Sequence, residues 1–198
     1  MTGSVEFFFD YGSPFSYLAD TQMADLEKST GTTVVYRPML LGGVLKATGN
    51  ASPMAVPAKG AYMGLELRRW AELYGVPFRA NPFPFRSNTL RLMRGAVASQ
   101  RLGVFCAYHR SVFPAVWGEP LDLGDEAVFR RLLERAAIDP QRLLDAIEAQ
   151  DTKDELRRST EEAVRRGVFG APTFFVGDEM FWGKDRLDFV ERLLKLSR

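Results

Sequence analysis

The sequence predicts an α/β fold in which a small sheet domain is interrupted by a large all-helical insertion. Residues 5–38 follow a β-α-β pattern, residues 58–147 carry helical patterns, and residues 151–196 end the chain with a helix, a β-hairpin and a helix. The connection between the second strand and the hairpin is too long for a single crossover. The two ends of the chain are therefore expected to supply the four strands of one sheet.

The N-terminal part is typical of a β-α-β unit. Residues 5–10 contain the apolar run Phe7-Phe8-Phe9, which suits a buried strand. Residues 14–29 have a helical period, and residues 33–38 form a second, β-branched strand. Residues 40–57 are rich in glycine and proline, which predicts a loop with room for a short helical turn. The apolar side of the first helix is formed by Leu18, Met23 and Leu26.

Helical patterns fill the middle of the chain. Residues 58–74 are predicted to form a helix that is stopped by Gly75. Residues 81–85, Asn-Pro-Phe-Pro-Phe, are predicted to form an extended loop rich in aromatic side chains, because the two prolines restrict its backbone. Residues 151–166 carry many oppositely charged neighbours, which is typical of a solvated helix. The other helices are predicted over 89–100, 105–113, 126–136 and 140–147.

Strand patterns return near the C-terminus. Residues 173–176 and 180–182 flank Gly177-Asp178, a pair that favours a hairpin turn, and residues 187–196 close the chain as a helix. This order of elements matches a thioredoxin fold with a helical insertion. The thioredoxin-like domain is predicted to comprise residues 1–40 and 162–198, and the insertion residues 41–161.

Composition narrows the function classes. The 198 residues carry a net charge of +1 and no dense tract of lysine and arginine, which argues against a nucleic-acid partner. No apolar stretch has the length of a membrane span, and the N-terminus lacks a signal-like segment, so we expect a cytoplasmic location and no membrane partner. The single cysteine, Cys106, cannot form an intramolecular disulfide or a cysteine-based metal cluster, and no metal site is expected.

The strand-to-helix junction at Ser13 is the first candidate site. Gly12 permits a turn, Ser13 can cap the helix, and Pro14 suits the first helical position. The unpaired amides and the dipole at such a helix start favour negative charge, so a thiolate, phosphate or carboxylate brought against Ser13 would be stabilised without a metal. The alternative is an ordinary capping serine.

Five motifs occur in the order in which one known family carries them. They are FDYGSPFSYLA at 9–19, WAELYG at 70–75, AVWGE at 115–119, VFGAPT at 168–173 and GDEMFWGKDRL at 177–187. Each motif alone is weakly specific, but together they span nearly the whole chain. The chain thus resembles the DsbA-like branch of the thioredoxin superfamily, and within it the 2-hydroxychromene-2-carboxylate isomerases and the kappa-class glutathione transferases.

The resemblance implies glutathione as cofactor and Ser13 as the catalytic residue that donates a hydrogen bond to its sulfur. Redox relatives carry Cys-X-X-Cys at this junction, and Ser13 and Ser16 stand at the two cysteine positions, which excludes dithiol-disulfide chemistry. A free thiol has a pKa of about 8.5, so lowering it by roughly two units, or roughly 2.7 kcal/mol, would make most of it reactive. A charge-assisted hydrogen bond and a helix terminus can supply that amount.

Other glutathione-binding residues follow from the same resemblance. The bond before Pro172 is expected to be cis, so that the backbone of Ala171 can pair with the peptide. Asp185 would accept the γ-glutamyl amine, with Arg186 nearby. The alternatives are an ordinary loop proline and first-turn helix residues. Two more positions resemble family contacts to glutathione: Asn50 and Lys59.

For the substrate, the resemblance implies isomerisation of 2-hydroxychromene-2-carboxylate to trans-o-hydroxybenzylidenepyruvate in aromatic catabolism, by a homodimer. Transient addition of a thiolate to the conjugated system would remove the double bond that blocks rotation. The wall over this small aromatic carboxylate is placed at Phe83 and Phe85, with Asn88 following and Arg86 or Arg91 available for the carboxylate.

Two other functions stay open at this point. One is a kappa-like glutathione transferase or peroxidase that acts on a different electrophile, and the other is a non-catalytic thioredoxin-like module that binds peptide. Cys106 and His109 fall in the helical insertion, where neither enzyme function needs a catalytic group. We expect Cys106 to be a core thiol and His109 to be a surface or capping residue.

Overall fold

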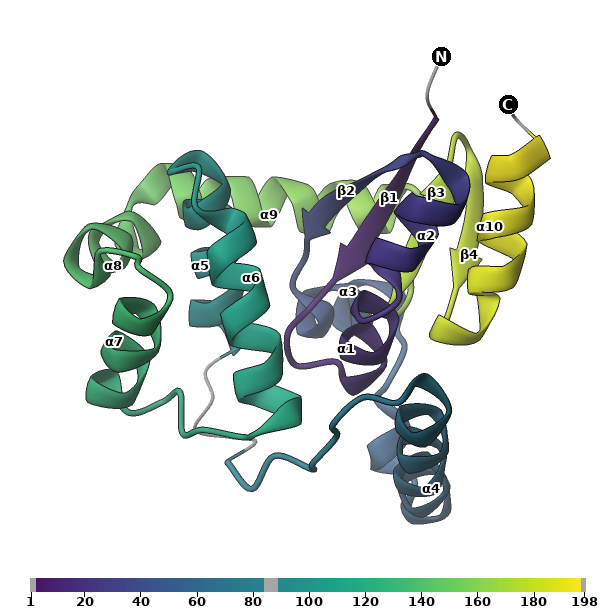
Figure 1. Cartoon of the computed structure of the whole chain (residues 1–198), viewed down its shortest axis with the longest axis horizontal. Helices are drawn as coiled ribbons and strands as arrows, with labels where there is room; N and C mark the ends of the chain where they lie inside the picture. Colours follow the sequence, from purple (N-terminus) through teal and green to yellow (C-terminus); the bar gives the residue numbers. More distant parts are fainter. Residues whose placement is uncertain (1–2, 84–88, 197–198) are drawn as a thin grey trace.

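The structure is a computed structural model that describes residues 3–83 and 89–196. Its sheet has four strands in the order β2-β1-β3-β4, with β1 parallel to β2 and both other pairs antiparallel. Segments from both ends of the chain thus share one sheet, as the sequence predicts (Figure 1). The strands are β1 (Ser4–Phe9), β2 (Thr33–Pro38), β3 (Thr173–Val176) and β4 (Glu179–Trp182).

Side chains of β1 alternate between the two faces of the sheet, and each face has its own core. Phe8 packs with Val44 on the face covered by α9. Phe7 and Phe9 belong to the larger core on the other face, together with residues of α1, α2 and α10. Figure 1 shows α2 in front of the sheet, α9 behind it and α10 beside β4. These helices are α1 (Pro14–Asp20), α2 (Met23–Thr30), α9 (Gln150–Arg165) and α10 (Leu187–Leu196).

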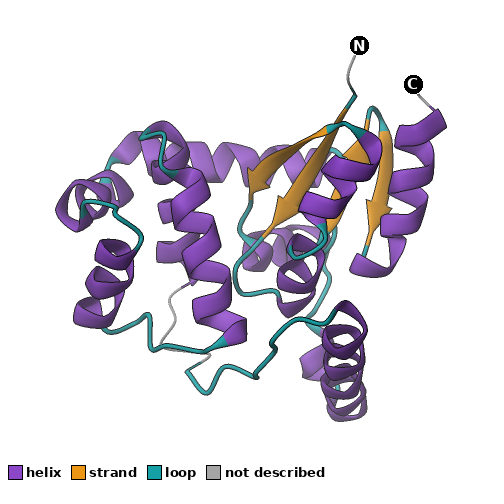
Figure 2. Ribbon diagram, in the orientation of Figure 1, coloured by secondary structure: helices purple, strands orange, loops and turns teal. Residues whose placement is uncertain are grey.

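Helices α5 to α8 form a bundle beside the sheet, and α4 lies apart from it, near α1 (Figure 2). α5 packs on α6, α8 and α9, and both α5 and α9 contact β2, so both helices join the bundle to the sheet. In the described parts of the chain, no helix combines the length and the apolarity that a membrane crossing requires. The bundle helices and α4 are α4 (Pro57–Tyr74), α5 (Thr89–Arg101), α6 (Phe105–Phe113), α7 (Glu126–Arg135) and α8 (Pro140–Glu148).

Most predicted elements lie within one residue of the observed ones, but residues 14–29 form two helices instead of one. The break falls at Thr21 and Gln22. The hydroxyl of Thr21 donates to the carbonyl of Leu18, and the N–H of Gln22 bonds to the carbonyl of Ala19, three residues back. The three-residue backbone bond interrupts the regular α-helical pattern, and α2 begins at Met23.

The glycine-rich segment after β2 also differs from the predicted loop. It contains the eight-residue helix α3 (Leu41–Thr48), which ends at Gly49 with a left-handed φ of 67°. The helix forms despite Gly42 and Gly43 because Val44 is buried against the sheet and because the N–H of Leu41 is bonded by a distant carboxylate. Both causes are tertiary contacts that the local composition does not reveal.

The predictions for Cys106 and His109 are wrong. Cys106 is exposed, whereas His109 is only 4% exposed. The buried face of α6 is formed by Tyr108, His109, Val112 and Phe113, so the histidine points into the core and the cysteine lies outside that face. A neutral histidine with both ring nitrogens bonded can be buried without an uncompensated polar group.

Candidate active site

Ser13 caps the first helix and faces a loop from the other end of the chain. Its backbone is extended (φ −95°, ψ 111°), and its Oγ accepts the N–H of Ser16 at 3.1 Å, as an N-cap does. The same hydroxyl donates to the carbonyl of Ala171 at 3.3 Å. Ser13 is 3% exposed, so both interactions are largely shielded from water.

The facing loop has the predicted cis peptide bond between Ala171 and Pro172. Several hydrogen bonds hold this loop in place. The carbonyl of Pro172 accepts the N–H of Gly183 at 3.0 Å, and the side chain of Asn50 donates to the carbonyl of Phe169 at 2.9 Å. Asn50 therefore braces the loop from the end of α3.

The predicted residues Asp185 and Arg186 lie in a short 3-10 turn (Lys184–Arg186) directly after Gly183. They pair with each other at 2.8 Å and are exposed. The hydrogen bond from Gly183 to Pro172 brings this turn next to the loop that faces Ser13. The structure thus gathers most of the predicted glutathione-binding residues at one end of the sheet, through contacts between β4, the cis-proline loop and α1.

The structure does not place Lys59 or the predicted substrate-wall residues that it describes among the residues gathered around Ser13. Lys59 is exposed in the first turn of α4, and within the described part of the chain no hydrogen bond or ion pair joins it to Ser13 or Asp185. Phe83 is half-buried, and its N–H donates to Asn81 at 2.7 Å. The guanidinium of Arg91 lies 4.8 Å from the ring centroid of Phe129. The remaining predicted wall residues, Phe85, Arg86 and Asn88, lie outside the described residues.

Asp10 is a site residue that the sequence analysis missed. Its carboxylate, 2% exposed, accepts the N–H of Gly12 and the N–H of Leu41, each at 2.8 Å. Asp10 thereby ties the turn before Ser13 to the start of α3. Burial raises the pKa of Asp10 to about 6, and the two backbone hydrogen bonds oppose that shift. The Asp-X-Gly pattern, typical of a side chain that bonds its own turn, was the signal for this residue.

The raised pKa of Asp10 predicts a pH-dependent stability. Folded Asp10 binds its proton more tightly than the unfolded chain, whose value is near 3.8, so its contribution to the free energy of unfolding is largest below about pH 4. That contribution falls as pH rises to about 6, by roughly 3 kcal/mol. Urea unfolding across this range should show that the stability of Asp10→Asn relative to the wild type increases with pH. Parallel pH profiles for the two proteins would contradict the assignment.

Lys184 is a second residue that the sequence analysis missed. It is 7% exposed, and its Nζ lies 4.1 Å from the ring centroid of Trp70, 5.0 Å from that of Phe15 and 3.8 Å from a carboxylate oxygen of Glu66. Burial lowers the pKa of Lys184, while Asp185 and Glu66 oppose that shift. The cation links α4 to the first turn of α1, an arrangement that a lysine in a polar sequence does not reveal.

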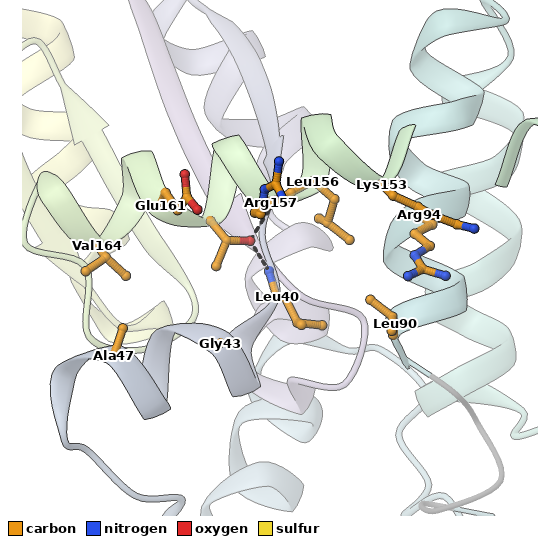
Figure 3. Close-up of a pocket in the computed structure, with 11 residues that line it drawn as sticks. Leu40, Gly43, Ala47, Leu90, Arg94, Lys153, Leu156, Arg157, Glu161 and Val164 are labelled. Atoms are coloured by element: carbon orange, nitrogen blue, oxygen red, sulfur yellow. Dashed lines mark hydrogen bonds between the residues drawn. The ribbon is translucent and has the colours of Figure 1, made fainter. Parts of the chain in front are cut away.

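A cavity of about 460 Å³ lies between α3, α5 and α9 (Figure 3). Its lining is largely apolar, with Leu40, Leu90 and Leu156, and Figure 3 shows Arg94 and Lys153 at the α5 end. The size and the apolar lining are those of a small-molecule site. The N–H of Leu41, next to this wall, bonds the carboxylate that also holds the turn before Ser13.

The family model of the DSBA-like thioredoxin domain matches residues 4–195. The chain belongs to this family. It is 37% identical over 198 residues to the 2-hydroxychromene-2-carboxylate isomerase of Sphingobium xenophagum, covering 98% of this chain and 99% of the relative. A solved structure of a 2-hydroxychromene-2-carboxylate isomerase superposes with a TM-score of 0.87 at 34% identity, covering 96% of this chain and 94% of the other.

Relatives with lower sequence identity are named as a different enzyme, glutathione S-transferase kappa. Glutathione S-transferase kappa 1 of Rattus norvegicus is 28% identical over an alignment of 203 positions that covers 96% of this chain and 90% of the relative. These similarities confirm the predicted DsbA-like thioredoxin fold and the resemblance to the isomerases and the kappa-class transferases. This DSBA-like chain thus belongs to an enzyme branch of its family.

Proposed function

We propose that this DSBA-like protein is a glutathione-dependent isomerase that converts 2-hydroxychromene-2-carboxylate to trans-o-hydroxybenzylidenepyruvate. The 37% identity to an isomerase over nearly the full length of both chains carries this proposal. The kappa-class relatives support the use of glutathione. The position of Ser13 opposite the carbonyl of Ala171 supports the same cofactor, because a hydroxyl beside a backbone carbonyl can contact both the thiol and the peptide part of glutathione.

Ser13 would hold the sulfur of glutathione as a thiolate. Its Oγ already accepts the N–H of Ser16, which leaves its own proton for another acceptor. That proton now goes to the carbonyl of Ala171 at 3.3 Å, a long hydrogen bond that is readily exchanged for a stronger one. A charged sulfur is the better acceptor, so the exchange favours the ionised thiol. The low exposure of Ser13 strengthens the interaction further.

The other proposed contacts hold the peptide part of glutathione. Once the Ser13 proton is withdrawn, the carbonyl of Ala171 can accept a peptide N–H, in the manner of an added strand. Asp185 would accept the γ-glutamyl amine, with Arg186 beside it. The Asn50 amide has already used one N–H on Phe169, so a contact to glutathione would use its second N–H. Lys59 and Pro172 complete the proposed glutathione-binding set.

When bound, glutathione supplies a thiolate that can add to a conjugated double bond and leave again, which permits rotation without net redox change. This chain would orient the aromatic carboxylate against that sulfur. We propose Phe83, with Phe85, Arg86 and Asn88, as the wall over the substrate. We also propose a cytoplasmic homodimer in which residues 1–40 and 162–198 form the thioredoxin-like domain and residues 41–161 the helical insertion. Sedimentation velocity tests the dimer.

Two measurements on the purified protein test the proposed function. Calorimetry with millimolar reduced glutathione should detect binding, and a spectrophotometric assay should detect isomerisation of the chromene carboxylate only when glutathione is present. Absence of binding would leave a non-catalytic module. Isomerisation without glutathione would overturn the proposed cofactor. Binding without isomerisation, but with conjugation of an electrophile such as 1-chloro-2,4-dinitrobenzene, would favour a kappa-like transferase.

A further inference from the structure

His109, the single histidine of the chain, is held between two side chains of the segment that contains Ser13. Its Nδ1 lies 2.9 Å from the hydroxyl of Tyr11, and its Nε2 lies 2.8 Å from a carboxylate oxygen of Asp20. Tyr11 precedes the capped helix start and Asp20 is the last residue of α1. His109 therefore reaches from α6 to both ends of the segment that positions Ser13.

In the neutral form of His109, the directions of its two hydrogen bonds follow from its partners. A carboxylate only accepts, so Nε2 carries a proton toward Asp20. In a neutral ring Nδ1 is then the acceptor, and the hydroxyl of Tyr11 donates to it. The ring itself is enclosed by aromatic side chains whose centroids lie 4.6 to 5.0 Å away: Phe9, Tyr36, Phe105 and Phe113. These rings pack around the imidazole, and both of its nitrogens are bonded.

Tyr11 is also tied to the helical insertion by its backbone. Its N–H lies 3.2 Å from the sulfur of Met93 in α5, and its carbonyl accepts the indole N–H of Trp117 at 2.7 Å. The side chain of Tyr11 is fully buried and contacts the insertion through His109. Every polar group of Tyr11 is thus bonded to the insertion, two residues before Ser13.

We propose that His109 is a positioning residue that holds the Ser13 hydroxyl in place by clamping Tyr11 and Asp20 to the helical insertion. This inference rests on the proposed role of Ser13 toward glutathione. Small displacements of a catalytic group reduce the reaction rate strongly, because a hydrogen bond to a developing charge depends on distance and angle. Loss of the clamp would weaken the bond from Ser13 to sulfur without removing any group that touches glutathione.

The test compares two tyrosine-to-phenylalanine variants, each of which removes one buried hydroxyl and keeps the ring. Tyr11→Phe breaks the bond to His109. Tyr108→Phe is the matched control, because Tyr108 is equally buried and its hydroxyl donates to Leu92 at 2.9 Å, not to the Ser13 segment. Its ring, whose centroid lies 6.0 Å from that of Tyr11, is kept in the variant. Both variants should lower the midpoint of thermal unfolding by similar amounts. Only Tyr11→Phe should lower kcat, by roughly 5- to 20-fold.

The second readout is the pKa of the enzyme-bound glutathione thiol, followed by the ultraviolet absorbance of the thiolate as pH is varied. Tyr11→Phe should raise this pKa toward that of free glutathione, and Tyr108→Phe should leave it unchanged. His109→Asn, whose amide oxygen can still accept from Tyr11, should retain more activity than His109→Leu.

The outcomes separate this inference from the proposed function. If the wild type binds glutathione and isomerises the substrate, but Tyr11→Phe keeps kcat within twofold and leaves the thiol pKa unchanged, His109 has only a packing role. Equal losses in Tyr11→Phe and Tyr108→Phe would also overturn the positioning role. If the wild type fails to bind glutathione, the proposed function fails first, and the inference falls with it.

Discussion

Replacing Ser13 by alanine is expected to lower kcat/KM for chromene isomerisation roughly 10- to 100-fold at neutral pH. The hydroxyl is proposed to stabilise the glutathione thiolate, and a hydrogen bond to a charged group contributes roughly 1.5–3 kcal/mol. The loss of activity should shrink as pH rises toward the pKa of a free thiol, about 8.5, because the glutathione thiol then ionises even without the hydrogen bond from Ser13. Initial rates measured across pH, with saturating glutathione, check both the size and the pH dependence of the effect.

The control for this variant must account for stability, since Ser13 also caps α1. Loss of an N-cap costs about 0.5–2 kcal/mol. Asp139→Ala removes a similar cap, because Asp139 accepts the N–H of Arg142 at the start of α8, in the helical insertion. This control should lose comparable stability and keep its activity. A rate for Ser13→Ala within a factor of two of the wild type would show that Ser13 is only a cap.

Replacing Gly95 by alanine is expected to lower the free energy of unfolding by about 2–3 kcal/mol. Gly95 lies inside α5, where helix propensity alone predicts a gain of about 1 kcal/mol from alanine. An added Cβ would overlap the hydroxyl of Tyr108 and lie 2.6 Å from its Cζ. Tyr108 is fully buried and bonded to Leu92, so its ring has no free space to move into.

The matched control is Gly64→Ala in the middle of α4. Gly64 is exposed, and no heavy atom lies within 4 Å of an added Cβ. Urea unfolding should show a small gain in stability for Gly64→Ala and a large loss for Gly95→Ala. Adding Tyr108→Phe to Gly95→Ala should restore part of the loss, because it removes the hydroxyl that overlaps. Equal gains in both glycine variants would show that α5 and α6 can separate at no cost.

The elements that the sequence predicted correctly are those whose signals are local. Residues 33–38 and 105–113 have the predicted bounds because their side-chain period and flanking residues specify them without help from distant segments. The N-cap at Ser13 was predicted from its immediate neighbours, Gly12 and Pro14. The cis bond before Pro172 followed from the family resemblance.

The residues that the sequence analysis missed depend on partners far along the chain. His109 is buried because Tyr11 and Asp20, 98 and 89 residues away, bond both of its ring nitrogens. Lys184 is buried because the rings of Phe15 and Trp70 and the carboxylate of Glu66 surround its ammonium group. α3 forms where a loop was predicted because Asp10 bonds its first residue and Val44 is buried.

Short-range signals in the sequence predict most of the strands and helices, the family, and the serine at the start of the first helix. These depend on short-range periodicity, on capping residues and on motifs that neighbouring residues complete. Which polar side chains are buried around that serine, and why position 95 requires glycine, depends on contacts that form only in the folded protein. Burial of a polar group is stable only when its hydrogen-bond partners are brought to it, and the partners of Asp10, His109 and Lys184 come together only when the insertion packs against the sheet domain.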